Sequence, residues 1–165
     1  MIQVFNDPFL LDYVKACIVL PQDEREQVEA LTGHPYNIDS IAVGNYMAQG
    51  PKWVAKDGDE VLSVGGFVQE RPGVWRDYML TTPQAWEKAY WFQMTRICRR
   101  IGDFMFSSKQ AHRLELITPV ARLEKRPELK RWYTHLGYGI EGTRHGYCAN
   151  GGDAVAFVRV NHGHG

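Results

Sequence analysis

The chain contains 165 residues, of which 44% are hydrophobic and 23% carry charge. This composition is typical of a folded protein and predicts a single domain over residues 1–165. Nineteen basic residues balance nineteen acidic ones, which excludes a whole-chain electrostatic grip on nucleic acid or anionic lipid. No apolar run approaches the roughly 18 residues of a membrane span. The first residues mix acids with apolar side chains and lack a basic opening, so we expect no signal peptide and synthesis in the cytoplasm.

The three cysteines, Cys17, Cys98 and Cys148, are widely spaced. No Cys-x-x-Cys pair or cysteine–histidine cluster occurs, so the sequence predicts neither a disulfide framework nor a metal site. We expect isolated thiols in or near the core. His162 and His164 lie in a glycine-rich tail, and a frayed end is a simpler interpretation of this tail than adventitious metal binding.

The first half of the chain is predicted to form helices followed by a β-meander. Residues 1–20 are expected to be helical, and a second helix should begin after Pro21 and end at Gly33. Residues 34–51 predict a loop with at most one short helix. The three strand candidates are 52–57, 60–68 and 74–82. Because the turns between them are short, these strands should pair as an antiparallel meander.

The second half begins with a long predicted helix. Thr82 suits the N-cap and Pro83 the first helical position, and apolar residues recur every three to four positions over 84–106. The remaining candidates are a strand at 112–120, a short helix closed by Gly137, and strands near 138–148 and 153–160. This order predicts an α+β fold with a mixed, mostly antiparallel central sheet flanked by helices. One parallel, right-handed crossover should join the strands on either side of the long helix.

Two adjacent glycines, Gly65 and Gly66, interrupt the second strand of the meander. Paired glycines in a strand indicate either a bulge or the close approach of another group to the backbone. Both interpretations are compatible with a sheet that splays open to bind a ligand.

The segment Arg131–Tyr138 reads RWYTHLGY. Together with the order of elements, it resembles the GNAT family of acyl-CoA N-acyltransferases, in which an aromatic pair followed by glycine and an aromatic residue marks a short helix and the next strand. The resemblance covers about residues 10–160 and implies a GNAT-like sheet and acetyl-CoA as cofactor. It also implies that Tyr133 protonates the departing CoA thiolate. The alternative is that Tyr133 only packs against the sheet.

The resemblance further implies how the cofactor would be held. In the family, backbone groups of the strand before the long helix pair with the pantetheine arm, which here would use Tyr78, Met79 and Leu80. A glycine-rich loop then cradles the pyrophosphate with its N–H groups. Here that loop begins at Thr81 and Thr82 and contains no glycine.

Other departures affect the same loop. Pro83 removes one N–H donor and Trp86 adds bulk in the first turn, so anion binding should be weakened, although a helix N-terminus still offers free N–H groups. Arg126 stands where many members of the family have an asparagine. A strand that ends in Thr-Thr, with tryptophan four residues later and the layout KRPELKRWYTHLGY, resembles a phage-encoded branch of the fold that includes a small internal virion protein of podophages.

A transferase of this family also needs a group that removes the proton from the amine. Asp77 and Glu70 on the meander are the candidates, and Glu115 is a weaker one; a water held by the backbone is another. Such a base must first lie within hydrogen-bond distance of the amine, and its pKa must then lie near the working pH. The alternative for Asp77 is a solvated strand residue paired with Arg76 or another surface cation.

Two basic clusters remain, one formed by Arg96, Arg99 and Arg100 and the other by Lys125, Arg126, Lys130 and Arg131. They could bind the 3′-phosphate of CoA or nucleic acid, but solvated helix faces with local ion pairs are the favoured interpretation.

These observations leave two main functional hypotheses. The first is a degenerate, phage-type GNAT scaffold with little or no transferase activity, which acts by binding a phage or host protein, in the host cytoplasm or as a virion component. The second is an active N-acetyltransferase in which the amine attacks the thioester directly, with Asp77 or a water as base and Tyr133 as acid. A nucleic-acid binder that uses the arginines of the long helix is a third and weaker hypothesis, and nucleic acid is not the expected partner.

Overall fold

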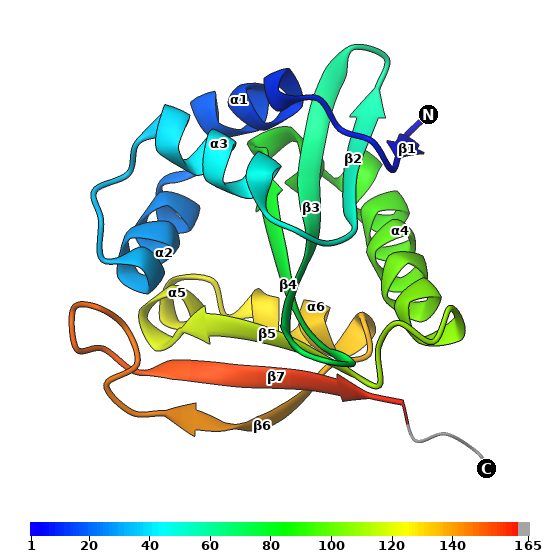
Figure 1. The fold of residues 1–165 in the computed structure, drawn as a ribbon. Coiled ribbons are helices and arrows are strands. Elements are labelled where there is room, and N and C mark those ends of the chain that lie inside the picture. The colour runs from blue at the N-terminus through cyan, green and yellow to red at the C-terminus, as the bar shows by residue number, and fades with distance from the viewer. Residues whose placement is uncertain (162–165) are drawn as a thin grey trace.

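The computed structural model describes residues 1–161, so the interpretation of His162 and His164 lies outside the described residues. One seven-stranded sheet has the order β1-β2-β3-β4-β5-β7-β6, and Figure 1 shows helices on both sides of it. The strands are β1 (Gln3–Phe5), β2 (Lys52–Asp57), β3 (Glu60–Arg71), β4 (Val74–Thr81), β5 (Arg113–Pro119), β6 (Gly139–Arg144) and β7 (Ala154–Val160). The helices are α1 (Leu10–Ile18), α2 (Gln22–Thr32), α3 (Ile38–Met47), α4 (Lys88–Ser107), α5 (Val120–Lys125) and α6 (Glu128–His135). Among the described residues, no helix is both long and apolar enough to cross a bilayer.

The predicted α+β class and the mostly antiparallel sheet are confirmed. The pair β4–β5 is parallel, and the other five pairs in the sheet are antiparallel. The helix α4 connects β4 to β5, as the crossover required.

The strands of the meander divide their side chains between two helical layers, because neighbouring side chains of a strand point to opposite faces. Val54 and Val64 pack with Tyr13 of α1, whereas Trp53 packs in a second cluster with Met94 of α4. The helices α1 and α3 therefore cover one face of this half of the sheet and α4 covers the other (Figure 1).

The parallel strands β4 and β5 pair over only three positions. The paired residues are Val74 with Arg113, Trp75 with Leu114 and Arg76 with Glu115. On their other edges, β4 stays paired with β3 and β5 with β7. From Asp77 onward the two strands diverge, and the sheet opens into a wedge at its centre.

Near the N-terminus, the structure corrects two expectations. Residues 3–5 form β1, which pairs with β2, rather than the start of a helix. The segment predicted to be mainly loop contains α3, a helix of ten residues. Asn37 makes this helix possible, because its side-chain oxygen accepts a 2.9 Å hydrogen bond from the Ser40 N–H.

The expected boundaries around the long helix and the last strands are also wrong in part. Residues Pro83–Trp86 form a 3₁₀ turn and α4 begins only at Lys88. Thr82 occupies the N-cap position of this turn and Pro83 its first position, but the Thr82 side chain makes no capping hydrogen bond because its hydroxyl donates to the Leu62 carbonyl at 2.9 Å. The helix α5, which was not predicted, follows β5 directly, and β6 ends at Arg144 rather than near 148.

For Gly65 and Gly66, the structure supports the close-approach interpretation. The irregular positions in the pairing of β3 lie elsewhere along the strands. A Cβ atom on Gly65 would lie 2.5 Å from the indole of Trp53 and 2.8 Å from the carbonyl oxygen of Tyr78. These glycines therefore give room to neighbours that lie against the strand.

Candidate functional site

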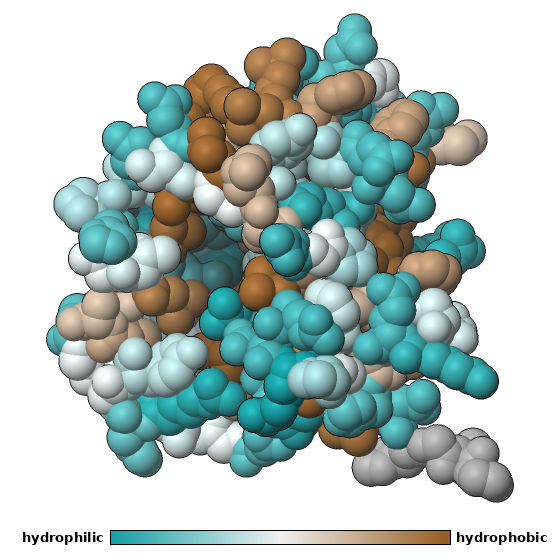
Figure 2. Space-filling view, viewed as in Figure 1, coloured by the Kyte–Doolittle hydropathy of each residue, from teal (hydrophilic) through white to brown (hydrophobic). Residues whose placement is uncertain are grey.

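The wedge between β4 and β5 opens into a cavity of about 490 Å³. Its lining comes from α2, β4, α4, β5 and α6, and Figure 2 shows a recess in the surface beside these elements. Asp77, Tyr133, Trp86, Glu24 and Arg122 all line it. The cavity thus brings together the two catalytic candidates, Asp77 and Tyr133, which the sequence could place near each other only through the family resemblance.

Asp77 is held by Tyr138 rather than by a surface cation. The Tyr138 phenol donates a 2.8 Å hydrogen bond to Asp77 Oδ2. Burial raises the pKa of the Asp77 carboxyl to about 7, although the Tyr138 hydrogen bond and the charge of Arg159 lower it. The alternative pairing with Arg76 is wrong, because Arg76 lies 3.2 Å from Glu70.

The other carboxylate candidates have ion-pair partners. Glu70 belongs to the half-exposed Arg76 pair. Glu115 is buried and lies 2.8 Å from Arg113 and 3.6 Å from Arg144. Of these three carboxylates, only Asp77 lines the cavity.

Tyr133 is almost completely buried, at 4% exposure. Its hydroxyl accepts a hydrogen bond from Thr118 Oγ1 at 3.4 Å, and its ring packs against Trp132 and Phe157. Burial raises the pKa of the phenol, and the nearby Arg122 charge lowers it. Tyr133 packs in the core and also lines the cavity. This position is compatible with both roles that the sequence predicts for it.

The predicted pantetheine strand is divided between the cavity and the core. The Tyr78 hydroxyl donates a 3.4 Å hydrogen bond to the carbonyl oxygen of Asn45 in α3. Met79 contacts Cys98 through their sulfur atoms at 3.7 Å, and Leu80 is buried in the core with α1. At the end of this strand, the Thr81 N–H donates to Glu24 Oε2 at 3.1 Å. A carboxylate from α2 therefore holds a backbone donor at the open edge of β4.

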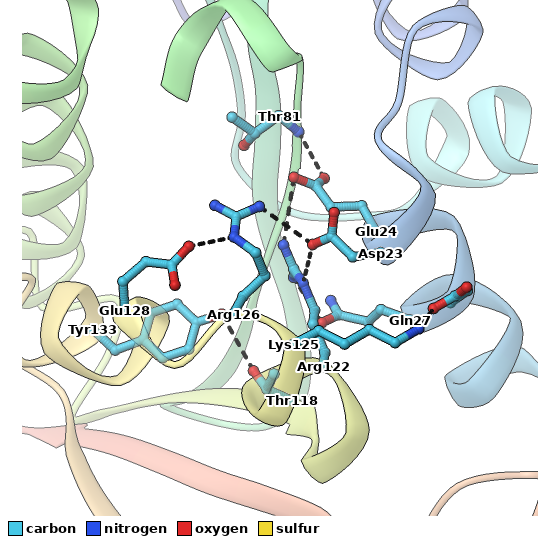
Figure 3. Close-up of polar contacts among 11 residues, drawn as sticks. Asp23, Glu24, Gln27, Thr81, Thr118, Arg122, Lys125, Arg126, Glu128 and Tyr133 are labelled. Atoms are coloured by element: carbon cyan, nitrogen blue, oxygen red, sulfur yellow. Dashed lines mark hydrogen bonds and ion pairs between the residues drawn. The ribbon is translucent and has the colours of Figure 1, made fainter. Parts of the chain in front are cut away.

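Glu24 is part of a network that joins α2 to α5 across the wedge (Figure 3). Arg122 donates to Asp23 at 3.1 Å and to Gln27 at 2.7 Å, and its Nη2 lies 3.5 Å from Glu24 Oε1. Both Glu24 and Arg122 are more than nine-tenths buried. Burial raises the pKa of Glu24 to about 7, whereas Arg122 and the Thr81 N–H lower it.

Sequence reasoning missed this network. The acids after Pro21 suit a helix N-terminus, and that local role explains them completely. Asp23 and Arg122 are 99 positions apart, so no local pattern connects them. The only available signal was the basic cluster that begins with Lys125 and Arg126, close to Arg122 in the sequence. The favoured interpretation of that cluster was a solvated helix face.

Arg126, the residue at the family's asparagine position, interacts with neighbouring aromatic and acidic side chains. Its guanidinium lies over the ring of Trp86, 4.6 Å from the centroid, and it pairs with Asp23 at 3.5 Å and with Glu128. Lys125 pairs with Glu26. The ion-pair interpretation of this basic cluster is therefore confirmed for Lys125 and Arg126.

The loop at the position of the phosphate cradle is filled by aromatic side chains. Trp86 lies 4.9 Å from Trp91 and 5.4 Å from Trp132 between ring centroids. Ala85 is buried in the neighbouring cluster that contains Trp53 and Met94, and Glu87 immediately precedes α4. The cradle is thus replaced by a packed turn with an acidic residue next to the helix.

The cysteines are free, with Cys17 and Cys148 buried and Cys98 half-buried, as predicted. Among the described residues, no group of three histidine, cysteine or acidic side chains could hold a metal ion.

No protein-family model matches the sequence, and no curated protein matches it either. The structure, however, is similar to solved acetyltransferases. A spermidine N-acetyltransferase from Vibrio cholerae in complex with CoA and spermine aligns with a TM-score of 0.69 and 12% identity, over 96% of this chain and 95% of the other. AAC(6′)-Ib in complex with ribostamycin and coenzyme A aligns with a TM-score of 0.68 and 14% identity, over 97% and 93%. The chain therefore has the GNAT fold.

Proposed function

We propose that the protein is a phage-type GNAT scaffold that has lost acetyl-CoA binding and acts by binding a phage or host protein, in the host cytoplasm or as a virion component. The observation that carries this proposal is that side chains of the protein itself occupy the end of the wedge where the cofactor would bind. Glu24 already holds the Thr81 N–H, and the turn that should cradle pyrophosphate is filled by Trp86 under Arg126.

Physical chemistry explains why these features oppose CoA. A pyrophosphate needs several convergent N–H donors and a favourable helix N-terminus. Pro83 supplies no N–H, and Glu87 places a negative charge next to the start of α4. Because Glu24 already accepts the hydrogen bond of the Thr81 N–H, this backbone donor is not free to bind a phosphate oxygen.

A binding role is supported by exposed apolar side chains at α1 and α3, the two helices that cover one face of the meander. Phe9 and Leu11 at α1 are 72% and 59% exposed, and Met47 of α3 is 68% exposed. Figure 2 shows apolar surface gathered where α1 lies in Figure 1. Apolar surface of this kind marks protein contact sites. The phage assignment itself is supported by the Thr81-Thr82 ending, Trp86 and the KRPELKRWYTHLGY layout.

The second candidate is an active N-acetyltransferase, and the position of Asp77 favours it. A carboxyl with a pKa of about 7 beside a cavity can accept a proton from an ammonium group near neutral pH. In this mechanism the freed amine attacks the thioester carbonyl, the carbon–sulfur bond breaks, and Tyr133 protonates the departing thiolate. The proton that the nitrogen loses on becoming an amide restores the Tyr133 phenol. The solved acetyltransferases with CoA bound show that the fold accommodates such a cofactor.

Calorimetric titration of the protein with acetyl-CoA and with CoA separates the two candidates. The proposal expects no binding heat and no thermal protection at millimolar ligand. Micromolar binding would contradict it and would make the kinetics of Tyr133→Phe and Asp77→Asn with a panel of amines the next measurement.

The binding role is tested separately with Leu11→Asp on α1. The wild-type protein should retain one defined phage or host protein in pull-downs from infected cells, and Leu11→Asp should lose it while its circular dichroism spectrum is unchanged. Exposed Lys15 on the same helix provides the control Lys15→Asp. Equal retention by both variants would contradict a contact through α1.

A further inference from the structure

The side chain of Glu24 is surrounded by hydrogen-bond donors from three different elements. The Thr81 N–H at the end of β4 lies 3.1 Å from Oε2, and Arg122 Nη2 of α5 lies 3.5 Å from Oε1. The side chain of Trp86, in the turn that follows β4, lines the same cavity, and its indole N–H is buried. All four residues line the one cavity.

Two atoms in this arrangement are incompletely satisfied. Glu24 Oε1 and Trp86 Nε1 are buried and have no hydrogen-bond partner among the described residues. Buried polar groups normally have partners. The Thr81 N–H and the Arg122 guanidinium therefore face one carboxylate, and this carboxylate belongs to the chain itself.

We propose that Glu24 is an internal ligand of a carboxylate-binding site formed by the Thr81 N–H and the Arg122 guanidinium, beside the unpartnered Trp86 indole N–H, and that it keeps this end of the wedge closed. The network of α2 with α5 holds the ligand in place (Figure 3). Asp23 and Gln27, on the same helix as Glu24, bind the other nitrogens of Arg122. A free carboxylate can enter only when Glu24 is absent or displaced.

This inference rests on the proposed function in one respect: it explains the proposed loss of acyl-CoA binding by a wedge whose end Glu24 keeps closed. Its test uses no CoA, so the two proposals fail independently.

The experiment is chemical rescue of Glu24→Ala with sodium acetate, against sodium chloride at equal ionic strength. Truncation leaves a hole of the size of a small carboxylic acid beside three donors, one of them charged. Acetate should raise the melting temperature of Glu24→Ala by about 2–4 °C in a saturable manner. The wild type and the control Glu26→Ala, whose carboxylate is exposed and pairs with Lys125, should show no such gain.

Adding Arg122→Gln to Glu24→Ala should abolish the acetate effect. Equal responses of Glu24→Ala and Glu26→Ala to acetate would overturn the proposal.

A second measurement keeps the proposal testable if Glu24→Ala does not fold. Glu24→Asp retains the charge but shortens the reach by one methylene, so the Thr81 amide should exchange with solvent deuterium at least about tenfold faster than in the wild type. The control Glu26→Asp should leave that rate unchanged. An unchanged rate in Glu24→Asp would show that the carboxylate does not hold this N–H.

Discussion

The phenol of Tyr138 donates a 2.8 Å hydrogen bond to the carboxyl of Asp77. Asp77 is the first residue of β4 beyond its last pair with β5, and Tyr138 precedes β6. The contact therefore joins the two halves of the sheet at the point where they diverge. It also fixes the orientation of Asp77, the base in our second candidate function.

Tyr138→Phe should lower the free energy of unfolding by about 1–3 kcal/mol, because it leaves a poorly solvated carboxyl without its partner. Urea denaturation of the variant and the wild type measures the difference. Tyr147→Phe is the control, because Tyr147 is 42% exposed. An effect as small as that of the control would show that the Asp77 contact contributes little.

Stability should fall as the pH rises from about 5 to about 8. Burial raises the pKa values of Glu24 and Asp77 to about 7, whereas unfolded carboxyls titrate near 4. Between these values the folded state holds protons that the unfolded state has lost, so each rise in pH favours unfolding. Denaturant titrations across this window should show a loss on the order of 5 kcal/mol, about half from each group. Asp77→Asn should roughly halve this loss, and a profile that rises with pH would refute the assignment.

The aromatic cluster that replaces the phosphate cradle should depend on Trp132. Its side chain is 4% exposed, contacts Trp86 and Trp91, and donates to Thr95 Oγ1 at 3.0 Å. Trp132→Ala should cost about 3–5 kcal/mol of unfolding free energy. Phe104→Ala, at a side chain 59% exposed on α4, should change it by less than about 0.5 kcal/mol. Similar losses in both variants would contradict a packed cluster.

Two glycine substitutions should have opposite signs. Gly65→Ala would force a Cβ against the Trp53 indole and the backbone of β4, at a cost of about 1–3 kcal/mol. Gly44→Ala lies in α3 with no heavy atom within 4 Å of the new Cβ, and alanine stabilises a helix by about 0.5–1 kcal/mol relative to glycine. Thermal unfolding of the two variants gives a direct comparison, and a stabilised Gly65→Ala would show that the strand accommodates a side chain.

The sequence predicted the features that have local causes. The meander followed from alternating strands and short turns, and most of α4 followed from its apolar period. The start of α4 was misplaced because Thr82 suits an N-cap, but its hydroxyl is used by the neighbouring strand β3. The site shows the same division. Tyr133 and Asp77 were found through a motif and a strand position, whereas Glu24 and Arg122 meet only through the folding of distant segments.

The position of β7 between β5 and β6 has a consequence for the order of folding. Of the described strands, β7 is the last in the chain, yet it is the only strand through which β6 joins the sheet. The strand β6 can therefore join the sheet only together with β7 or after it. Substitutions that weaken the pairing of β7 with β5 should release both strands and reduce the yield of folded protein more than equal changes in β1, which pairs only with β2.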